Sequence, residues 1–182
     1  MFENFFGLSE NPFRLTPDPK FLFLSDVHKE ALSHLRYGIE QRMGFVMVTG
    51  EVGTGKTTIC RQLLKSLDSQ VHTALILHPA LSDIELLESI NRDFGLAAAA
   101  DTKKGLMDEL FDFLLEVNGR GENAVLIIDE GQNLDPAVLE QVRMLSNLET
   151  ENQKLLQILL LGQPELGEML ACNNLRQLSD RI

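Results

Sequence analysis

The stretch GFVMVTGEVGTGKTT, residues 44–58, decides the fold class of this chain. It opens with FVMVT, a short apolar and β-branched run that predicts a buried strand over 45–49. A glycine-rich segment follows, and TTICRQLLKSL, residues 57–67, then has the pattern of a helix. A buried strand joined to a helix by a glycine-rich turn is the local structure from which phosphate-binding loops are built.

The turn matches the spacing G-x-x-x-x-G-K-[ST] through Gly50, Gly55, Lys56 and Thr57. Its glycines allow the backbone to bend so that N–H groups point inward at an anion, and the helix adds the positive end of its dipole. We expect Lys56 to reach the β- and γ-phosphates of ATP and the Thr57 hydroxyl to bind Mg²⁺. A glycine-rich turn with a solvated lysine is the simpler alternative. The residues predicted to contact the nucleotide are Gly50, Glu51, Val52, Gly53, Thr54, Gly55, Lys56, Thr57 and Thr58.

The run AVLIIDE, residues 124–130, ends in two carboxylates at the place where ligands of open α/β sheets bind. We expect Asp129 to hold Mg²⁺ through its water shell. Glu130 is a candidate catalytic residue that polarises the water attacking the γ-phosphate. Its presence favours hydrolysis over binding alone. The simpler alternative is a pair of solvated acids at a strand end.

The run LLQILLLG, residues 155–162, predicts another strand, and Gln163 follows it directly. A polar residue at this point can contact the γ-phosphate or orient water, which makes Gln163 a candidate catalytic residue. Gly-Gln-Pro-Glu is also ordinary turn chemistry, so that alternative stays open.

Strands and helices alternate along the rest of the chain. Their apolar runs do not alternate with polar residues, which is typical of a parallel sheet covered on both faces. The predicted fold is therefore α/β, a three-layer P-loop nucleoside triphosphatase with a mainly parallel sheet. The remaining strand is expected over 73–78, and amphipathic helices over 26–42, 82–95, 105–118 and 136–148.

Composition restricts the class of protein. The 182 residues, 44% of them hydrophobic, are enough for one sizeable core. A formal net charge of -11 argues against a surface that coats DNA, because duplex binding depends on neutralising phosphates. Cys60 and Cys172 are too few for a disulfide framework, which favours a reducing compartment. With no signal peptide and no long apolar run, we expect a cytoplasmic chain or the cytoplasmic domain of an inner-membrane protein.

The chain divides into two parts. Residues 1–24 are rich in proline and phenylalanine and lack a helical period, so they are predicted to form an irregular segment packed on the core. Residues 25–182 are predicted to form the P-loop ATPase core. Leu24, His28 and Tyr37 are candidate neighbours of the adenine base, with ordinary packing as the alternative.

Six stretches resemble the AAA+ ATPase module of the general secretion pathway A group (ExeA/GspA), which includes MshM-like pilus-biogenesis ATPases. The resemblance covers essentially the whole chain. It implies a AAA+ fold, Mg²⁺-dependent ATP hydrolysis and action as a homo-oligomeric ring. It also implies protein partners in a secretion or type IV pilus machine, no nucleic-acid partner, and membrane association only through parts outside this chain. The stretches are FFGLSENPF, LTPDPKFLFLS, HKEALSHLRYGI, GFVMVTGEVGTGKTT, DEGQNLDPAVLEQVRMLSNLET and LLQILLLGQPEL.

The resemblance places the Walker A motif on the P-loop residues, Walker B on Asp129 and Glu130, and sensor 1 on Gln163. One departure is His78-Pro79, where relatives often carry Asn-Pro. His78 either restrains Glu130 in a pH-dependent way, because histidine titrates near neutrality, or simply caps a strand end.

The last eight residues, LRQLSDRI, contain two arginines. The resemblance implies that one of them reaches the γ-phosphate in a neighbouring subunit, with Arg181 as first choice and Arg176 as second. On a continuous helix they point about 140° apart, so both are not expected to reach one phosphate. The alternative is two solvated arginines favoured by a helix dipole.

AAA+ proteins continue with a fifth strand and a helical lid, and neither is recognisable in this sequence. We therefore expect an exposed edge on strand 45–49 and weak hydrolysis by this chain alone. The leading functional hypothesis is an ATPase that powers assembly of an envelope machine. The alternatives are a DNA-dependent ATPase of transposition or replication initiation, and a nucleotide-gated switch, against which Glu130 argues.

Overall fold

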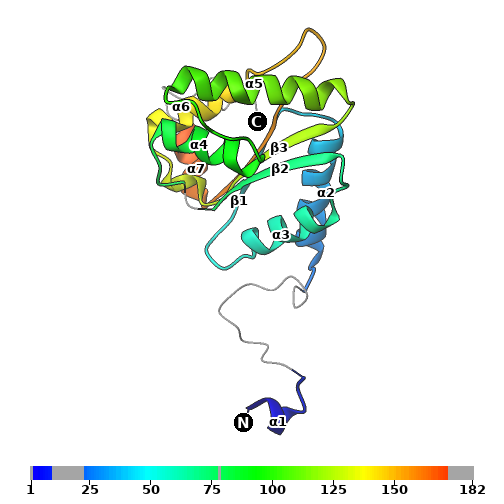
Figure 1. Cartoon of the computed structure of the whole chain (residues 1–182). Coiled ribbons are helices and arrows are strands. Elements are labelled where there is room, and N and C mark those ends of the chain that lie inside the picture. The colour runs from blue at the N-terminus through cyan, green and yellow to red at the C-terminus, as the bar shows by residue number, and fades with distance from the viewer. Residues whose placement is uncertain (1, 10–22, 78, 172–182) are drawn as a thin grey trace.

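A computed structural model describes residues 2–9, 23–77 and 79–171. Its centre is a four-stranded sheet in the order β1-β4-β3-β2, in which every neighbouring pair is parallel (Figure 1). The strands are β1 (Phe45–Thr49), β2 (Val71–Ile76), β3 (Asn123–Ile128) and β4 (Gln157–Gly162).

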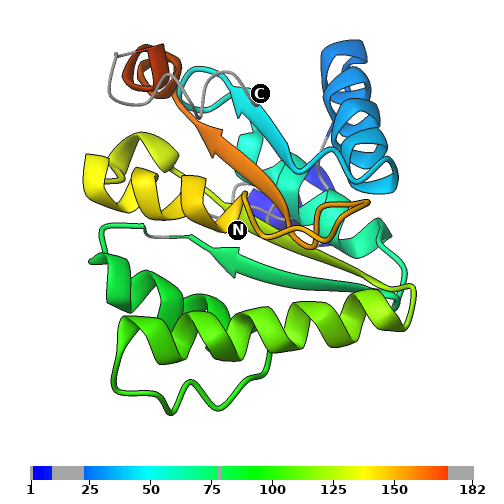
Figure 2. The same cartoon turned by 90° about the horizontal axis from the view of Figure 1, so that it is seen from above.

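Helices cover both faces of the sheet, which gives three layers (Figure 2). On one face, α2 and α3 pack against Val125, Ile127, Leu159 and Leu161. On the other face, α4, α5, α6 and α7 pack against the alternate residues of the same two strands. The predicted three-layer α/β fold is confirmed. The helices are α1 (Phe2–Phe6), α2 (Asp26–Glu40), α3 (Lys56–Ser66), α4 (Asp83–Asp93), α5 (Lys103–Gly119), α6 (Pro136–Leu145) and α7 (Pro164–Ala171), with a 3₁₀ turn η2 (Gly131–Asn133).

Local sequence explains where several helices begin. The Ser25 hydroxyl accepts a hydrogen bond from the backbone N–H of His28 at the start of α2. Ser82 and Glu85 form a complete capping box at the start of α4. Pro136 occupies the first turn of α6, where its missing N–H has no consequence.

Strand β1 lies at one edge of the sheet. It pairs with β4 on one side, and in the described part of the chain no other strand pairs with it. A groove of about 880 Å³, lined by residues of α2 and β1, runs beside the free edge. Among residues 2–9, 23–77 and 79–171, nothing pairs with the outer edge of strand 45–49, as expected for an exposed edge.

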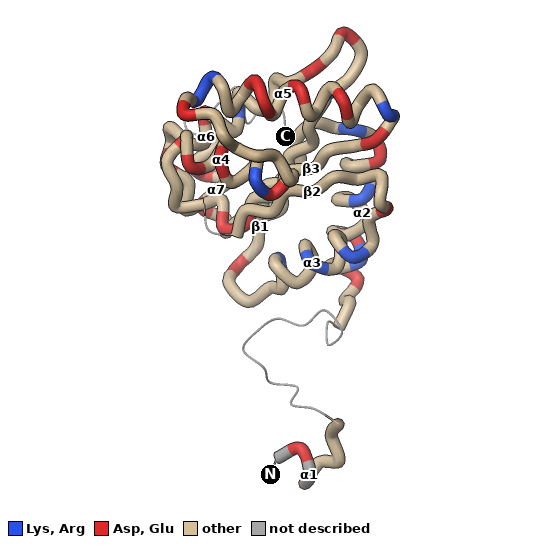
Figure 3. Tube along the Cα trace, in the orientation of Figure 1, with Lys and Arg blue, Asp and Glu red and all other residues tan. Residues whose placement is uncertain are grey.

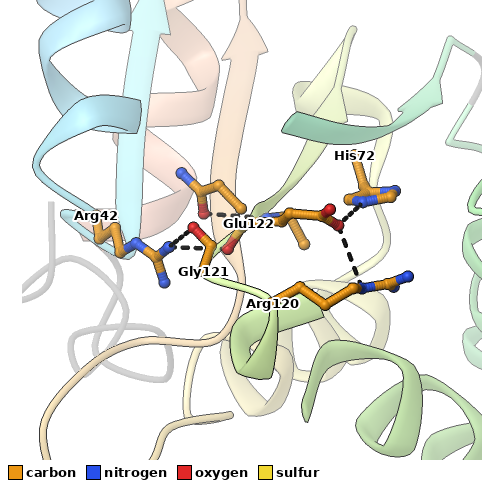
Figure 4. A network of polar contacts seen from close by, with 7 residues as sticks. Arg42, His72, Arg120, Gly121 and Glu122 are labelled. Atoms are coloured by element: carbon orange, nitrogen blue, oxygen red, sulfur yellow. Dashed lines mark hydrogen bonds and ion pairs between the residues drawn. The ribbon is translucent and has the colours of Figure 1, made fainter. Parts of the chain in front are cut away.

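A polar network joins the amino ends of the strands, opposite the P-loop (Figure 4). The Arg42 guanidinium donates to the backbone carbonyl of Glu122 at 2.8 Å and to Oδ1 of Asn118 at 3.0 Å. The Glu122 carboxylate accepts from Nε2 of His72 at 2.7 Å and also faces Arg120. These contacts connect the segment between α2 and β1 to the α5–β3 turn and to β2.

The N-terminal phenylalanines differ from expectation where the structure describes them. Phe5 and Phe23 are 81% and 84% exposed, and Phe6 is also exposed. Residues 2–6 form the short helix α1 and are not irregular. Phe13 and Phe21 lie outside the described residues. Among the described helices, none is both long and apolar enough to cross a membrane.

Candidate active site

The loop between β1 and α3 has the backbone of a phosphate cradle. Gly53 and Gly55 have φ of +79° and +86°, in the left-handed region that side chains rarely adopt. Gly55 is the N-cap of α3 and supplies no side-chain cap, so the first N–H groups of the helix are left for a ligand. Two of the loop glycines thus occupy positions whose positive φ favours glycine.

The Lys56 side chain folds back over this loop. Its ammonium group donates to the carbonyl oxygens of Gly50 at 2.6 Å and Glu51 at 3.0 Å, and the residue is only 9% exposed. An ammonium group has three donors, so two carbonyl contacts leave one for a phosphate oxygen. The lysine is therefore held at the centre of the cradle.

Asp129 follows β3 and meets the first turn of α3. It is 2% exposed, and its Oδ2 accepts a hydrogen bond of 2.5 Å from the Thr57 hydroxyl. Its backbone N–H donates to the carbonyl of Ile76 at 2.9 Å, which fixes it between the ends of β3 and β2. Two fixed oxygen atoms beside a phosphate cradle suit Mg²⁺, which takes one or two protein oxygens together with phosphates and water.

Glu130 has a strained backbone. Its φ of 55° and ψ of 39° lie in the left-handed region, which is uncommon for a residue with a side chain. Its N–H donates to Oδ1 of Asp129 at 2.9 Å, and the residue is the N-cap of η2. Such conformations concentrate at functional sites, where the surrounding structure enforces them.

Gln132 is a polar residue of this site that the sequence analysis did not single out. Its Nε2 donates to Oε2 of Glu130 at 2.6 Å, and its Oε1 accepts from the backbone N–H of Gln163 at 3.0 Å. Gln163, the predicted sensor, is thus joined to Glu130 through Gln132. The available signal was an amide side chain two positions after the acidic pair, within the quoted stretch DEGQNL.

The P-loop, the end of β3 and the end of β4 meet at one place. The N–H of Gly50 donates to the carbonyl of Gly162 at 3.1 Å, directly before Gln163. This bond attaches the start of the P-loop to the end of β4. The predicted residues Lys56, Thr57, Asp129 and Glu130 therefore lie around the carboxyl edge of the sheet.

The three candidate adenine neighbours lie in different places. His28 contacts the P-loop, with Nε2 at 3.0 Å from the carbonyl oxygen of Thr54 and Nδ1 at 3.1 Å from that of Phe23. Tyr37 lines the groove beside β1. Leu24 lines a hollow between α2 and α3. His28 is thus the candidate that the structure brings to the P-loop.

Cys60 lies one turn into α3 and is buried. Burial, assisted by the nearby Asp129 carboxylate, raises the pKa of its thiol to about 12. A thiol that stays protonated is a poor nucleophile, so Cys60 is a packing residue of this helix. The other cysteine and the remaining predicted site residues, His78, Arg176 and Arg181, lie outside the described residues.

Comparisons with known proteins give independent information on this chain. Residues 39–170 match the family described as "AAA domain". General secretion pathway protein A of Aeromonas hydrophila is 50% identical over 183 aligned residues, which include all of this chain. The chain spans about a third of that relative, 34% of its length.

Solved structures share the fold at low sequence identity. The Aeropyrum pernix ORC2 protein, solved in ADPNP–ADP complexes, superposes with a TM-score of 0.66 at 17% identity, covering 94% of this chain and 49% of that one. Cdc6p from Pyrobaculum aerophilum gives a TM-score of 0.66 at 15% identity, covering 98% of this chain and 48% of that one.

Proposed function

The chain belongs to the AAA domain family of P-loop ATPases, and we propose that it binds ATP with Mg²⁺ and hydrolyses it at the carboxyl edge of its sheet. The observation that carries this proposal is the convergence of a P-loop, a buried Asp129 bonded to Thr57, and Glu130 at one place. The likeness to General secretion pathway protein A supports the same activity.

Each residue of the site has a role in this reaction. The loop N–H groups and Lys56 bind the β- and γ-phosphates and stabilise the charge that spreads over the transferring group. Thr57 and Asp129 would hold Mg²⁺, whose positive charge offsets that of the phosphates. Both residues would offer oxygen atoms, the ligands that Mg²⁺ prefers, from the same side of the cradle.

Glu130 acts on the water. Its carboxylate accepts a hydrogen bond from the attacking water and orients the oxygen toward the γ-phosphorus, opposite the leaving oxygen. The strained backbone at Glu130 directs the side chain out of the strand and is maintained by the bond from its N–H to Asp129. Hydrolysis, and not binding alone, is therefore proposed.

A neighbouring subunit completes the site in this proposal. A AAA+ ring places an arginine in trans on the γ-phosphate, and Arg181 is the first candidate, with Arg176 the second. Such an arginine contributes about 10³–10⁵ in rate in well-studied nucleoside triphosphatases. We therefore expect weak hydrolysis when the subunits are apart.

The relative supports a proposal for the cellular role. We propose that the chain energises assembly of a secretion or type IV pilus-type envelope machine, acting as a homo-oligomer on the cytoplasmic side with protein partners. Membrane association would come from parts outside this chain. The 50% identity to General secretion pathway protein A supports this role.

The alternative is a DNA-dependent ATPase of transposition or replication initiation, and the ORC2 and Cdc6p structures do not decide for it. Their identity to this chain is below 20%, so they support the fold alone. The net charge of -11 opposes a DNA role. Figure 3 shows acidic residues spread over the α4–α7 layer, with lysines and arginines more frequent along α2 and α3.

The proposal is tested by the ATPase rate per subunit across protein concentration, with and without duplex DNA. We expect the rate per subunit to rise with protein concentration and to stay the same when duplex DNA is added. The rate should fall more in Arg181→Ala than in Arg176→Ala. A rate that is independent of concentration contradicts the trans arrangement. Strong stimulation by DNA favours the alternative function.

A further inference from the structure

We propose that Gln132 is a positioning residue for hydrolysis, which fixes the Glu130 carboxylate by joining it to the end of β4. This inference rests on the proposed ATPase function and adds a residue to it. Gln132 lies in η2, two positions after Glu130, and its side chain is half-buried.

The geometry uses both ends of the Gln132 amide. Its Nε2 donates at 2.6 Å to one carboxylate oxygen of Glu130, and its Oε1 accepts at 3.0 Å from the N–H of Gln163. Only a side chain with a donor and an acceptor on one group can make both bonds. The bond to Glu130 is short and charge-assisted, which makes it the stronger of the two.

Two glycines leave the room that this bridge needs. A Cβ at Gly162 would lie 2.9 Å from Oε1 of Gln132 and 2.7 Å from Cδ2 of Leu166. A Cβ at Gly131 would lie 2.7 Å from Cδ1 of Leu160. Both approaches are closer than real Cβ atoms tolerate, so these glycines allow η2 to lie against the end of β4. The position of Gln132 is thus built into the turn.

The bridge restrains a side chain that would otherwise rotate. A glutamate has three rotatable bonds, and free rotation would spread its carboxylate over many positions relative to the attacking water. The bond from Gln132 selects one carboxylate position, while the left-handed backbone selects the direction of the side chain. Holding a catalytic group in one geometry is a large source of rate.

The bridge also joins Glu130 to the P-loop through β4. The carbonyl of Gly162 accepts from the N–H of Gly50, and the next residue, Gln163, donates to Gln132. The phosphate cradle and the Glu130 carboxylate therefore share one hydrogen-bonded frame. A nucleotide that orders the P-loop orders the end of β4 on which Gln132 is anchored.

The test compares Gln132→Met, which keeps the length of the side chain and removes both hydrogen bonds, with Asn133→Met as a matched control on the exposed neighbour. MgATP affinity and the single-turnover hydrolysis rate are measured on the same samples, with thermal unfolding to establish that each variant is folded. We expect Gln132→Met to hydrolyse about 10- to 100-fold more slowly with affinity within about twofold of the parent. Asn133→Met should match the parent in both measurements.

A slower hydrolysis rate with unchanged MgATP affinity is a result that a merely structural role would not give, because a disturbed site would also bind the nucleotide less well. A Gln132→Met variant as fast as or faster than the parent, or one whose affinity falls as much as its rate, overturns the positioning role while the proposed function stands. A parent that neither binds nor hydrolyses MgATP overturns the proposed function and this role with it.

Discussion

The Thr57 hydroxyl and the Asp129 carboxylate lie 2.5 Å apart, although 72 positions separate them in the chain. Thr57 lies in the first turn of α3 and Asp129 follows β3, so the bond joins the helix after the P-loop to the end of a neighbouring strand. It also places two oxygen atoms where a metal bound to ATP phosphates would need them.

Replacing Thr57 with valine keeps the shape of the side chain and removes its oxygen. We expect ATP affinity in the presence of Mg²⁺ to fall about tenfold, while affinity without Mg²⁺ changes little. Because the buried Asp129 also loses a donor, the free energy of unfolding should fall by about 1–3 kcal/mol. Titration of ATP with and without Mg²⁺ checks the first point, and Thr57→Ser, which keeps the hydroxyl, is the control. Equal loss with and without Mg²⁺ contradicts the metal role.

Gly55→Ala tests the conformation of the P-loop. A Cβ at this position meets its nearest neighbour, Nε2 of His28, at an ordinary 3.6 Å, so space is not the difficulty. The difficulty is the backbone conformation. Gly55 has a φ of +86°, and this left-handed conformation costs a residue with a Cβ about 1–2 kcal/mol. We expect MgATP affinity to fall about tenfold as the loop relaxes from its cradle conformation. Gly167→Ala in α7, where nothing lies within 4 Å, should bind as the parent does.

Cys60 should resist thiol reagents while the protein is folded. With its pKa raised to about 12, the thiolate at pH 8 is about a thousandfold rarer than in an unfolded chain. Only the unfolded thiol ionises between about pH 8.5 and 12, so this group favours unfolding increasingly as pH rises through that range. Labelling in a Cys172→Ser background, with and without denaturant, measures the difference. Rapid labelling of the folded chain would show that Cys60 is accessible.

Arg42 should matter for stability and not for the reaction. Its guanidinium bonds Asn118 and the carbonyl of Glu122 at the end of the sheet away from the P-loop. We expect Arg42→Met to lower the free energy of unfolding by about 1–3 kcal/mol, because charged donors are lost from partly buried acceptors. Arg92→Met, which removes an exposed ion pair with Glu88, should cost no more than about 0.5 kcal/mol. Denaturant unfolding measures the loss of stability in each variant. A change in the MgATP affinity of Arg42→Met would contradict the expectation and indicate a connection between the two ends of the sheet.

Much of the fold could be predicted from local patterns. All six residues of β4 and five of the six in β3 are buried, and after the polar first residue of each strand both continue as apolar runs. The start of β2 was misplaced by two residues, at 73 and not at Val71. The reason is that the polar residue His72 interrupts the apolar pattern, although its backbone pairs with Ala124 of β3.

Some residues of the candidate site could be predicted from local sequence patterns, and others could not. Lys56, Thr57, Asp129 and Glu130 follow from motifs within short stretches, and the structure brings them together. Gln132 could not be found in this way, because its second partner, Gln163, lies 31 positions away. The contact of His28 with Thr54 spans 26 positions and was not expected, since His28 was predicted only as a candidate neighbour of the adenine base. Contacts between distant segments depend on how the layers pack, which periodicity does not specify.

The central claim is that ATP held by the P-loop is hydrolysed through Glu130. The most direct measurement is MgATP binding and single-turnover hydrolysis on the same samples of the parent, Lys56→Ala and Glu130→Gln, with protein in excess over ATP. The expected result is that Lys56→Ala loses binding, while Glu130→Gln binds as the parent does and hydrolyses at least about 100-fold more slowly. Hydrolysis by Glu130→Gln at the parent's rate would contradict the claim.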